Sequence, residues 1–266
     1  MKFKAFVVVF LLFTINVFLL NADEHLELGN PSNAVKDIYS NRNYLIERDQ
    51  YTLSYDNESA IPNWVSWHLG IKDLGDAKRS NSFYTDNSLP EGWYRVTPND
   101  YTNGGFDRGH MCPSADRTLS KDANKETFYM TNIVPQTAAN NQGPWAAFEN
   151  YLRSLVKDKG KEIYIVTGSW GFSNGTIKDE GKVKIPTSTW KVALILDEGP
   201  DDINRIDNNT KVIAIEISND DSLDRDWKKY LTTVNYIEHL TNYDFFSEID
   251  DTIEEVIESK LFDDKI

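Results

Sequence analysis

The sequence predicts a single α+β domain with a mostly antiparallel central sheet and flanking helices. Several short apolar or alternating segments are separated by turns, which is typical of antiparallel strands. One longer stretch that begins at Pro144 repeats its apolar residues at helical spacing instead. No internal repeat, low-complexity tract or Pro/Gly-rich linker divides the chain after Asp23. We therefore expect one folded domain over residues 23–266.

The expected strands are short runs in which apolar residues alternate with polar ones or follow one another directly. They cover residues 51–55, 65–69, 162–168, 183–185, 189–196 and 211–217. Trp67 lies in one of these strands, and we interpret it as a core residue rather than a platform for stacking bases.

The clearest expected helix begins at Pro144, a residue well suited to the first helical position. Its apolar residues recur at helical spacing until the sequence Lys157-Asp158-Lys159-Gly160 ends it. Trp145 belongs to this apolar stripe and is expected in the core. Shorter helices are expected over residues 223–230, 234–240 and 249–261.

Residues 1–22 are expected to form a cleaved export signal. Lys2 and Lys4 precede an apolar run, and polar residues follow it from Asp23. A permanent membrane anchor is the alternative, but the run contains polar Thr14 and Asn16 and has no basic flank after it. We therefore expect a secreted or periplasmic protein with no stable membrane association after cleavage.

The formal net charge of -14 at first argues against a nucleic-acid partner. The charge is unevenly distributed, however. Residues 197–266 contain 20 Asp or Glu and 7 Lys or Arg, so nearly all of the excess lies in the last quarter of the chain. The acidic part can face away from a polyanion while the earlier part supplies local cationic contacts.

The chain contains one cysteine, Cys112, so no intramolecular disulfide can form. Cys112 lies two residues after His110, which suggests a nucleophile or a metal ligand. No second cysteine or nearby histidine completes either arrangement, and we assign Cys112 neither role.

The most informative motif is Asp107-Arg108-Gly109-His110, which we place in a loop-like stretch. Histidine can take a proton from water near neutral pH, and an adjacent carboxylate can orient it. Arginine matches phosphate oxygens, and glycine lets the backbone approach a ligand. These residues suggest attack of water on a phosphodiester. The alternative is a surface ion pair between Asp107 and Arg108 beside a structural histidine.

A second motif surrounds the start of the Pro144 helix. Asn141 precedes the helix, and Glu149 and Arg153 lie one turn apart on it. The amide oxygen of Asn141 can bind a hard cation such as Mg²⁺, and Glu149 can hold the water molecules of that cation. Arg153 could reach a phosphate held by the metal. Taken alone, the same residues also fit an ordinary Glu/Arg pair on a solvated helix.

Taken together, the motifs resemble the DNA/RNA non-specific endonucleases of the ββα-metal superfamily. The likeness is greatest to the exported bacterial nuclease A type, with endonuclease G as a more distant relative. The matching segments run through most of the chain after Asp23. They are His25-Leu26, Leu28-Gly29-Asn30-Pro31-Ser32, Leu53-Ser54-Tyr55, Pro62-Asn63-Trp64-Val65-Ser66-Trp67, Phe106-Asp107-Arg108-Gly109-His110, Pro113-Ser114-Ala115-Asp116-Arg117, Met130-Thr131-Asn132, Pro135-Gln136, Asn141-Gln142-Gly143, Trp145 and Glu149.

The resemblance implies a role for each matched residue. His110 corresponds to the general base, Asn141 to the direct protein ligand of Mg²⁺ or Mn²⁺, and Glu149 to the residue that orients the metal-bound water. Arg79, Arg108 and Arg153 correspond to phosphate-binding arginines. Asp107 is expected to orient the loop or the histidine. The Met111-Cys112 pair departs from the family pattern and suggests sensitivity to thiol reagents.

The implied activity is hydrolysis of single- and double-stranded DNA and RNA to 5′-phosphate products. Two alternatives remain: a catalytically idle nucleic-acid-binding protein of the same fold, and a metal-dependent phosphoesterase for small molecules. A dedicated protein inhibitor in the producing cell is a further hypothesis, because a non-specific nuclease is hazardous before export. His25, His68 and His239 are expected to be structural or surface residues.

Overall fold

The computed structural model describes residues 24–178 and 181–263. The expected export signal, residues 1–22, lies outside the described residues. Among the residues that are described, no helix is both long and apolar enough to span a membrane.

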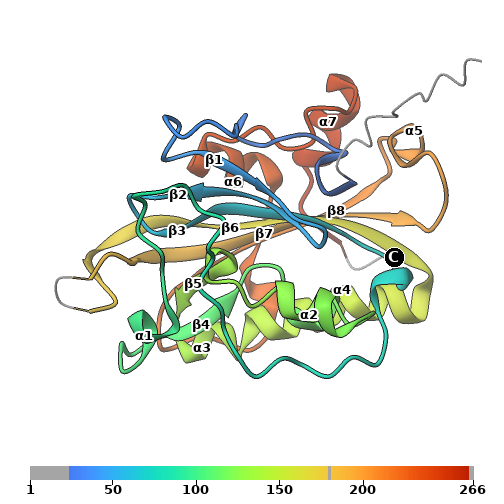
Figure 1. Cartoon of the computed structure of the whole chain (residues 1–266). Helices are drawn as coiled ribbons and strands as arrows, with labels where there is room; N and C mark the ends of the chain where they lie inside the picture. Colours follow the sequence, from blue (N-terminus) through green and yellow to red (C-terminus); the bar gives the residue numbers. More distant parts are fainter. Residues whose placement is uncertain (1–23, 179–180, 264–266) are drawn as a thin grey trace, which may run out of the picture.

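A seven-stranded antiparallel sheet runs through the centre of the molecule (Figure 1). Its strands, in spatial order, are β1 (Tyr44–Glu47), β2 (Thr52–Asp56), β3 (Ile61–Leu69), β6 (Lys161–Thr176), β7 (Lys184–Asp197), β8 (Lys211–Ser218) and β9 (Leu231–Thr232). All of their pairings are antiparallel, as predicted. The two segments expected at residues 183–185 and 189–196 form one continuous strand, β7.

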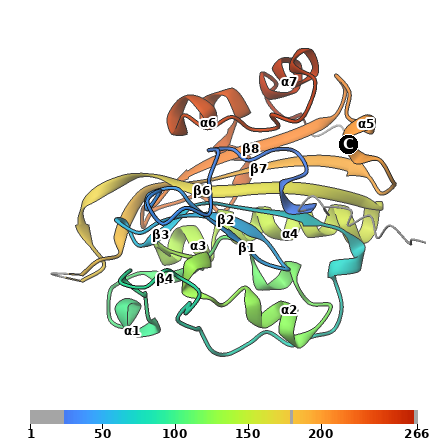
Figure 2. The same ribbon diagram turned by 45° about the horizontal axis from the view of Figure 1, so that its top comes forward.

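Helices and a small second sheet cover the two faces of the central sheet. The second sheet pairs β4 (Asp107–His110) with β5 (Ile133–Gln136). It lies on the same side as α1 (Pro98–Tyr101), α2 (Lys121–Glu126), α3 (Ala138–Asn141) and α4 (Pro144–Lys159) (Figure 2). Helices α6 (Val234–Thr241) and α7 (Asp251–Glu258) cover the opposite face, and α5 (Asp202–Arg205) lies at one end (Figure 2).

Short 3-10 helices connect these elements. They are Glu24–Leu26, Ile71–Asp73, Ser114–Asp116, Met130–Asn132 and Trp227–Tyr230. The helix expected over residues 223–230 is therefore wrong except for its last turn. The Asp224 and Asp226 side chains accept hydrogen bonds from the backbone N–H groups of Asp226 and Lys228. These local bonds replace those of a continuous helix.

Helix α4 agrees with its prediction at both ends. It begins at Pro144 and ends at Lys159, and Gly160 follows in the left-handed conformation with φ of 61°. Glycine adopts this conformation without a Cβ penalty, so it stops the helix at a defined residue. Trp145 and Phe148 are buried against the sheet, as the apolar stripe predicted.

Alternation along β7 divides the core into two clusters, one on each face of the sheet. Ala193 and Ile195 pack in the cluster beneath α4, whereas Trp190, Val192 and Leu194 pack in the cluster beneath α6. Successive side chains of a strand point to opposite faces. Lys191 lies two residues before Ala193 in the strand, so it points to the same face, into the α4 side of the core.

Candidate active site

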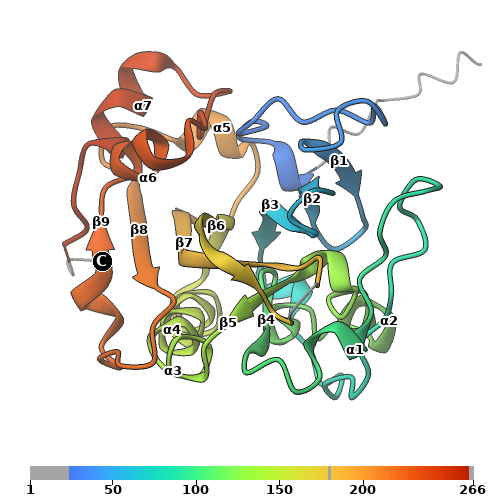
Figure 3. The same cartoon turned by 90° about the vertical axis from the view of Figure 1, so that its left-hand side faces the viewer.

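Strand β4 carries the Asp107-Arg108-Gly109-His110 motif, which was expected in a loop. The motif pairs along its whole length with β5, and Asp107 lies opposite Gln136. Gly109 is required here because a Cβ atom would lie 1.9 Å from the Gln136 side-chain oxygen. The ordered strand fixes the backbone of both Asp107 and His110, and Figure 3 shows β4 beside β5 in the layer that contains α4.

His110 is buried, with 7% of its surface exposed. Its ring packs against two aromatic rings that also contact each other, with centroid distances of 5.4 Å to Phe83 and 4.7 Å to Phe128. Its Nε2 atom has no hydrogen-bond partner among the described residues. Burial, assisted by the nearby charge of Arg79, lowers the pKa of His110 to about 3. The imidazole is therefore neutral and can accept a proton at physiological pH.

Asp107 orients Asn141 rather than the histidine. The Asp107 Oδ2 atom accepts hydrogen bonds of 2.8 Å from the side-chain amides of Asn141 and Gln142. Asp107 was expected to orient the loop or the histidine, and the histidine alternative is wrong, because the carboxylate turns toward the end of α3. No salt bridge joins Asp107 to Arg108 in the described part of the chain, so the surface ion-pair alternative also fails.

Glu149 belongs to a buried group of four charged residues. Its Oε1 atom lies 3.5 Å from Lys191 Nζ, and the Lys191 side chain is only 1% exposed. Arg153 Nη1 donates a 2.6 Å hydrogen bond to Asp116 Oδ1. Glu149, Lys191, Arg153 and Asp116 thus combine two carboxylates with two cations, and we call them the buried charge quartet. Desolvation raises the pKa of Glu149, while Lys191 and Arg153 oppose this shift.

Aromatic rings and hydrogen bonds hold the buried charge quartet in place. The Lys191 Nζ atom lies 4.3 Å from the centroid of the Trp145 ring and 5.4 Å from that of Trp67. Trp67 Nε1 donates a 3.0 Å hydrogen bond to Asp116 Oδ2. The two tryptophans are therefore core residues, as predicted, and they also contact the charges beneath the site.

The three predicted phosphate-binding arginines differ in their surroundings. Arg79 interacts electrostatically with both His110 and Glu149, and its guanidinium lies 4.9 Å from the centroid of the Phe128 ring, which also contacts His110. Arg108 donates a 2.8 Å hydrogen bond to the Pro98 carbonyl, so it is held by α1. Arg153 is 8% exposed and is occupied by Asp116 and Asn150. Arg79 is thus the arginine of the three that the electrostatics tie to the histidine.

The sequence analysis missed Lys191 and did not single out Asp116. A single lysine inside the apolar run 189–196 was the available signal, because β-strand periodicity places it on the same face as Ala193 and Ile195. Cys112 is fully buried, and burial raises the pKa of its thiol. The expected sensitivity to thiol reagents is therefore wrong for the folded protein, because neither access nor thiolate is available.

The other histidines have structural positions, as predicted. His25 Nε2 lies 3.2 Å from the Asp49 carbonyl, and His68 Nε2 lies 3.2 Å from Glu162 Oε2. His239 is exposed near the end of α6.

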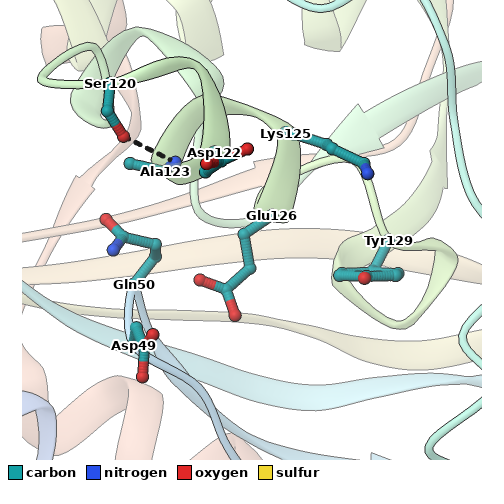
Figure 4. Close-up of a pocket in the computed structure, with 8 residues that line it drawn as sticks. All are labelled: Asp49, Gln50, Ser120, Asp122, Ala123, Lys125, Glu126 and Tyr129. Atoms are coloured by element: carbon teal, nitrogen blue, oxygen red, sulfur yellow. Dashed lines mark hydrogen bonds between the residues drawn. The ribbon is translucent and has the colours of Figure 1, made fainter.

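A polar cleft of about 430 Å³ lies near α2, but it does not coincide with the candidate site (Figure 4). Three carboxylates, those of Asp49, Asp122 and Glu126, line it with a single cation, Lys125. Figure 4 shows Glu126 extending from the ribbon toward Asp49 and Gln50. Such a lining repels phosphate, so we place nucleic-acid chemistry at His110 instead.

The oxygen donors of the candidate site fit a hard divalent cation. Asp107 accepts from the Asn141 amide nitrogen, which fixes the direction of the amide oxygen. That oxygen accepts no hydrogen bond from the described residues. Glu149 supplies a carboxylate on the adjoining helix α4. Amide and carboxylate oxygens are the ligands that Mg²⁺ and Mn²⁺ prefer.

A mixed α/β fold that carries a neutral buried histidine on β4 and an oriented amide at the end of α3 fits a nuclease of the ββα-metal class. Comparison with known families agrees: residues 28–252 match the model of the DNA/RNA non-specific endonucleases. The chain belongs to this family.

Relatives and a solved structure support the same assignment. The chain is 46% identical over 237 residues to a nuclease of Nostoc sp. (strain PCC 7120 / SAG 25.82 / UTEX 2576), which covers 89% of this chain and 85% of that nuclease. It is 33% identical over 189 residues to nuclease C1 of Cunninghamella echinulata var. echinulata, covering 66% of this chain and 71% of the relative.

A crystal structure of the EndoG/EndoGI complex contains a chain with a similar fold. The TM-score is 0.68 at 23% sequence identity, and the match covers 85% of this chain and 91% of that chain. The fold expected from the resemblance is therefore confirmed.

Proposed function

We propose that this protein is an exported endonuclease that hydrolyses phosphodiester bonds of single- and double-stranded DNA and RNA to 5′-phosphate products. The observation that carries the proposal is the neutral, buried His110 whose Nε2 atom lacks a partner among the described residues. A neutral imidazole with an unpartnered ring nitrogen has the protonation state that a general base requires. The hydrogen bond from Asn141 to Asp107 orients the side-chain amide, and this supports Asn141 as the ligand of a cation.

In the proposed reaction, His110 takes a proton from water as the water oxygen attacks phosphorus. The bond from phosphorus to the 3′ oxygen breaks, and the leaving oxygen takes a proton from a second water molecule, which leaves a 3′-hydroxyl and a 5′-phosphate. Mg²⁺ or Mn²⁺ held by Asn141 and, through water, by Glu149 would stabilise negative charge on the phosphate. General base catalysis contributes on the order of 10²- to 10⁴-fold.

Arg79, Arg108 and Arg153 are proposed to bind phosphate, with Arg79 nearest to the base in electrostatic terms. Arg153 can do so only through N–H groups left free by Asp116 and Asn150. Contacts to phosphates carry no information on base or sugar, which accounts for activity on both DNA and RNA. Binding should weaken as salt rises, with a shallow slope because few phosphates are contacted.

The test incubates the chain from Asp23 with supercoiled plasmid and with RNA, in Mg²⁺ or in EDTA. We expect both substrates to be degraded only with Mg²⁺, and a His110→Ala variant to lose the activity. Gel retardation of intact nucleic acid by the wild-type chain would instead favour the idle binding protein. Release of phosphate from a chromogenic monoester would favour a phosphoesterase for small molecules.

Export through an N-terminal signal, with a secreted or periplasmic location, is part of the proposal and rests on the pattern of residues 1–22. Secretion of the full chain from the producing cell, compared with a chain that begins at Asp23, tests it. A dedicated inhibitor protein is also proposed, because unexported enzyme would attack the nucleic acids of the producer. Failure to recover a tight partner from the producer's lysate would contradict the inhibitor.

A further inference from the structure

Four carboxylates come together on the face of the sheet opposite the candidate active site. Glu238 lies on α6, Asp244 on the connection that follows, and Glu254 and Glu258 lie one turn apart on α7. One carboxylate oxygen from each of Glu238, Asp244 and Glu254 lies within 4.8 Å of the others. We call these four residues the acidic quartet. Figures 1 and 3 show α6 and α7 side by side on this face.

Glu258 provides a second and independent indication of a ligand. It is only 5% exposed, and its buried Oε1 atom has no hydrogen-bond partner among the described residues. The Glu258 carboxyl group interacts with those of Glu238, Glu254 and Asp244, so it lies within the same cluster. Burial of a carboxylate without a donor or a cation is strongly unfavourable.

No protein cation balances the acidic quartet in the described part of the chain. None of the salt bridges among the described residues involves Glu238, Asp244, Glu254 or Glu258. Within the described part of the chain, the Phe245 backbone N–H donates to Glu238 Oε1 at 2.9 Å, and the side chains of Glu258 and Glu238 share a hydrogen bond. A bound cation would supply the positive charge that these salt bridges do not.

The ligand set identifies the kind of cation. Every ligand is a carboxylate oxygen, and no histidine or cysteine belongs to the cluster, so Zn²⁺ and other softer metals are disfavoured. Mg²⁺ demands a small octahedral site and retains most of its water. Ca²⁺ accepts several carboxylates from flexible segments in irregular geometry. Ligands from two helices and a connecting loop match the coordination described for Ca²⁺.

We propose that Glu238, Asp244, Glu254 and Glu258 form a calcium-binding site separate from the nuclease centre. The bound cation ties α7 and the connection at Asp244 to α6. This attachment adds to the apolar contacts of Ile253 and Ile257, which pack α7 onto the same core cluster. The site stabilises the fold and takes no part in the hydrolytic reaction.

The first experiment measures the thermal midpoint of the chain from Asp23 as CaCl₂ is added after treatment with EGTA. Three variants separate the two candidate cation sites. Glu254→Gln/Glu258→Gln removes two proposed ligands, and Asn141→Ala removes the proposed ligand at the nuclease centre. Asp251→Asn/Glu255→Gln is the matched control, because it removes two exposed carboxylates from the same helix.

We expect saturating Ca²⁺ to raise the midpoint of the wild-type chain on the order of 5 °C. The Asn141→Ala and Asp251→Asn/Glu255→Gln variants should keep this shift, and Glu254→Gln/Glu258→Gln should lose it. A shift lost in Asn141→Ala but kept in Glu254→Gln/Glu258→Gln would place the effect at the nuclease centre and overturn the proposal. The same holds if Ca²⁺ shifts no midpoint.

Direct binding supplies a second readout that does not depend on stability. Calorimetric titration of the Asn141→Ala variant with CaCl₂ should show one site, and adding the exposed change Asp244→Asn should weaken that site at least tenfold. Asp244 is exposed, so its replacement leaves the core intact. Unchanged binding in the Asp244→Asn variant would overturn the assignment. No outcome depends on nuclease activity, so failure of the proposed nuclease would not affect it.

Discussion

The two faces of the central sheet each cover a group of four charged residues, and the two groups are built differently. On the α4 side, Asp116 and Glu149 face Arg153 and Lys191. On the α6 side, the acidic quartet brings together four residues of one sign. The comparison shows that burial alone does not determine the state of a charged group. The partners supplied by the fold decide whether the group is complete or needs a ligand.

The buried charge quartet, in which each carboxylate has a cation as its partner, is the kind of group that an active site requires. A carboxylate held by a fixed cation keeps its position when substrate enters, because each charge is already compensated. The acidic quartet leaves its compensation to solution, so its effect depends on the concentration of a cation.

The largest expected effect comes from removing one cation of the buried charge quartet with Lys191→Met. Removal of the cation leaves the Glu149 carboxylate buried without its partner, so the free energy of unfolding should fall by roughly 3–5 kcal/mol. Urea denaturation measures the loss. The double variant Glu149→Gln/Lys191→Met removes both charges and should recover part of the stability. Equal stability of the single and double variants would show that the two residues are not coupled.

A lone carboxylate, Asp107, offers an intermediate case, because amide groups rather than cations satisfy it. Asp107→Ala should raise the Mg²⁺ concentration for half-maximal nuclease activity by about 10- to 100-fold, since Asn141 loses the group that orients it. Gln142→Ala is the matched control, because it removes the other contact of Asp107 and leaves Asn141 bonded. An unchanged Mg²⁺ requirement in Asp107→Ala would contradict this role.

The effect of pH on stability should have opposite signs at the two faces, at no more than about 1.4 kcal/mol per pH unit for each proton. Burial lowers the pKa of His110 from 6.5 to about 3. The contribution of His110 to the free energy of unfolding is therefore fully present above pH 6.5 and is lost as pH falls toward 3. Burial and the carboxylates of Glu238, Glu254 and Asp244 raise the pKa of Glu258 from 4.5 to about 9.

The contribution of Glu258 to the free energy of unfolding is therefore fully present below pH 4.5 and is lost as pH rises toward 9. Urea midpoints measured between pH 4 and pH 9 in EGTA would check both slopes. His110→Leu should flatten the acid side, and Glu258→Gln should flatten the alkaline side. The expectation fails if either variant changes the opposite side instead.

The smallest effect is expected from neutralising the acidic quartet without calcium. In EGTA, Glu254→Gln/Glu258→Gln should raise the free energy of unfolding by about 1 kcal/mol, because neutral amides remove the repulsion among the clustered carboxyl groups. The Asp251→Asn/Glu255→Gln control should give no such rise. A fall in stability of the Glu254→Gln/Glu258→Gln variant would indicate that the carboxylates are already compensated.

Local patterns in the sequence predicted the framework well. The apolar stripe after Pro144 identified α4, and Gly160 identified its end. Apolar alternation identified the main strands of the antiparallel sheet. The helix expected over residues 223–230 was wrong because short-range hydrogen bonds of Asp224 and Asp226 compete with helical ones.

The partners of the predicted site residues could not be found in the same way. Motifs drew attention to Asp107, Asn141 and Glu149, but the bond between Asp107 and Asn141 joins residues 34 positions apart. Lys191 lies 42 positions from Glu149 and meets it only after β7 packs beneath α4. The acidic quartet was visible only as excess charge near the end of the chain, because α6 and α7 must pack together before the four side chains converge.

The burial of Cys112 makes the protein its own reporter of local opening. The chain has one thiol, and the fold seals it completely two residues after His110. A thiol reagent can react only when this layer separates from the sheet, so the rate of labelling under native conditions measures how often the layer opens. Mass spectrometry can follow that rate without any engineered probe, with and without substrate present.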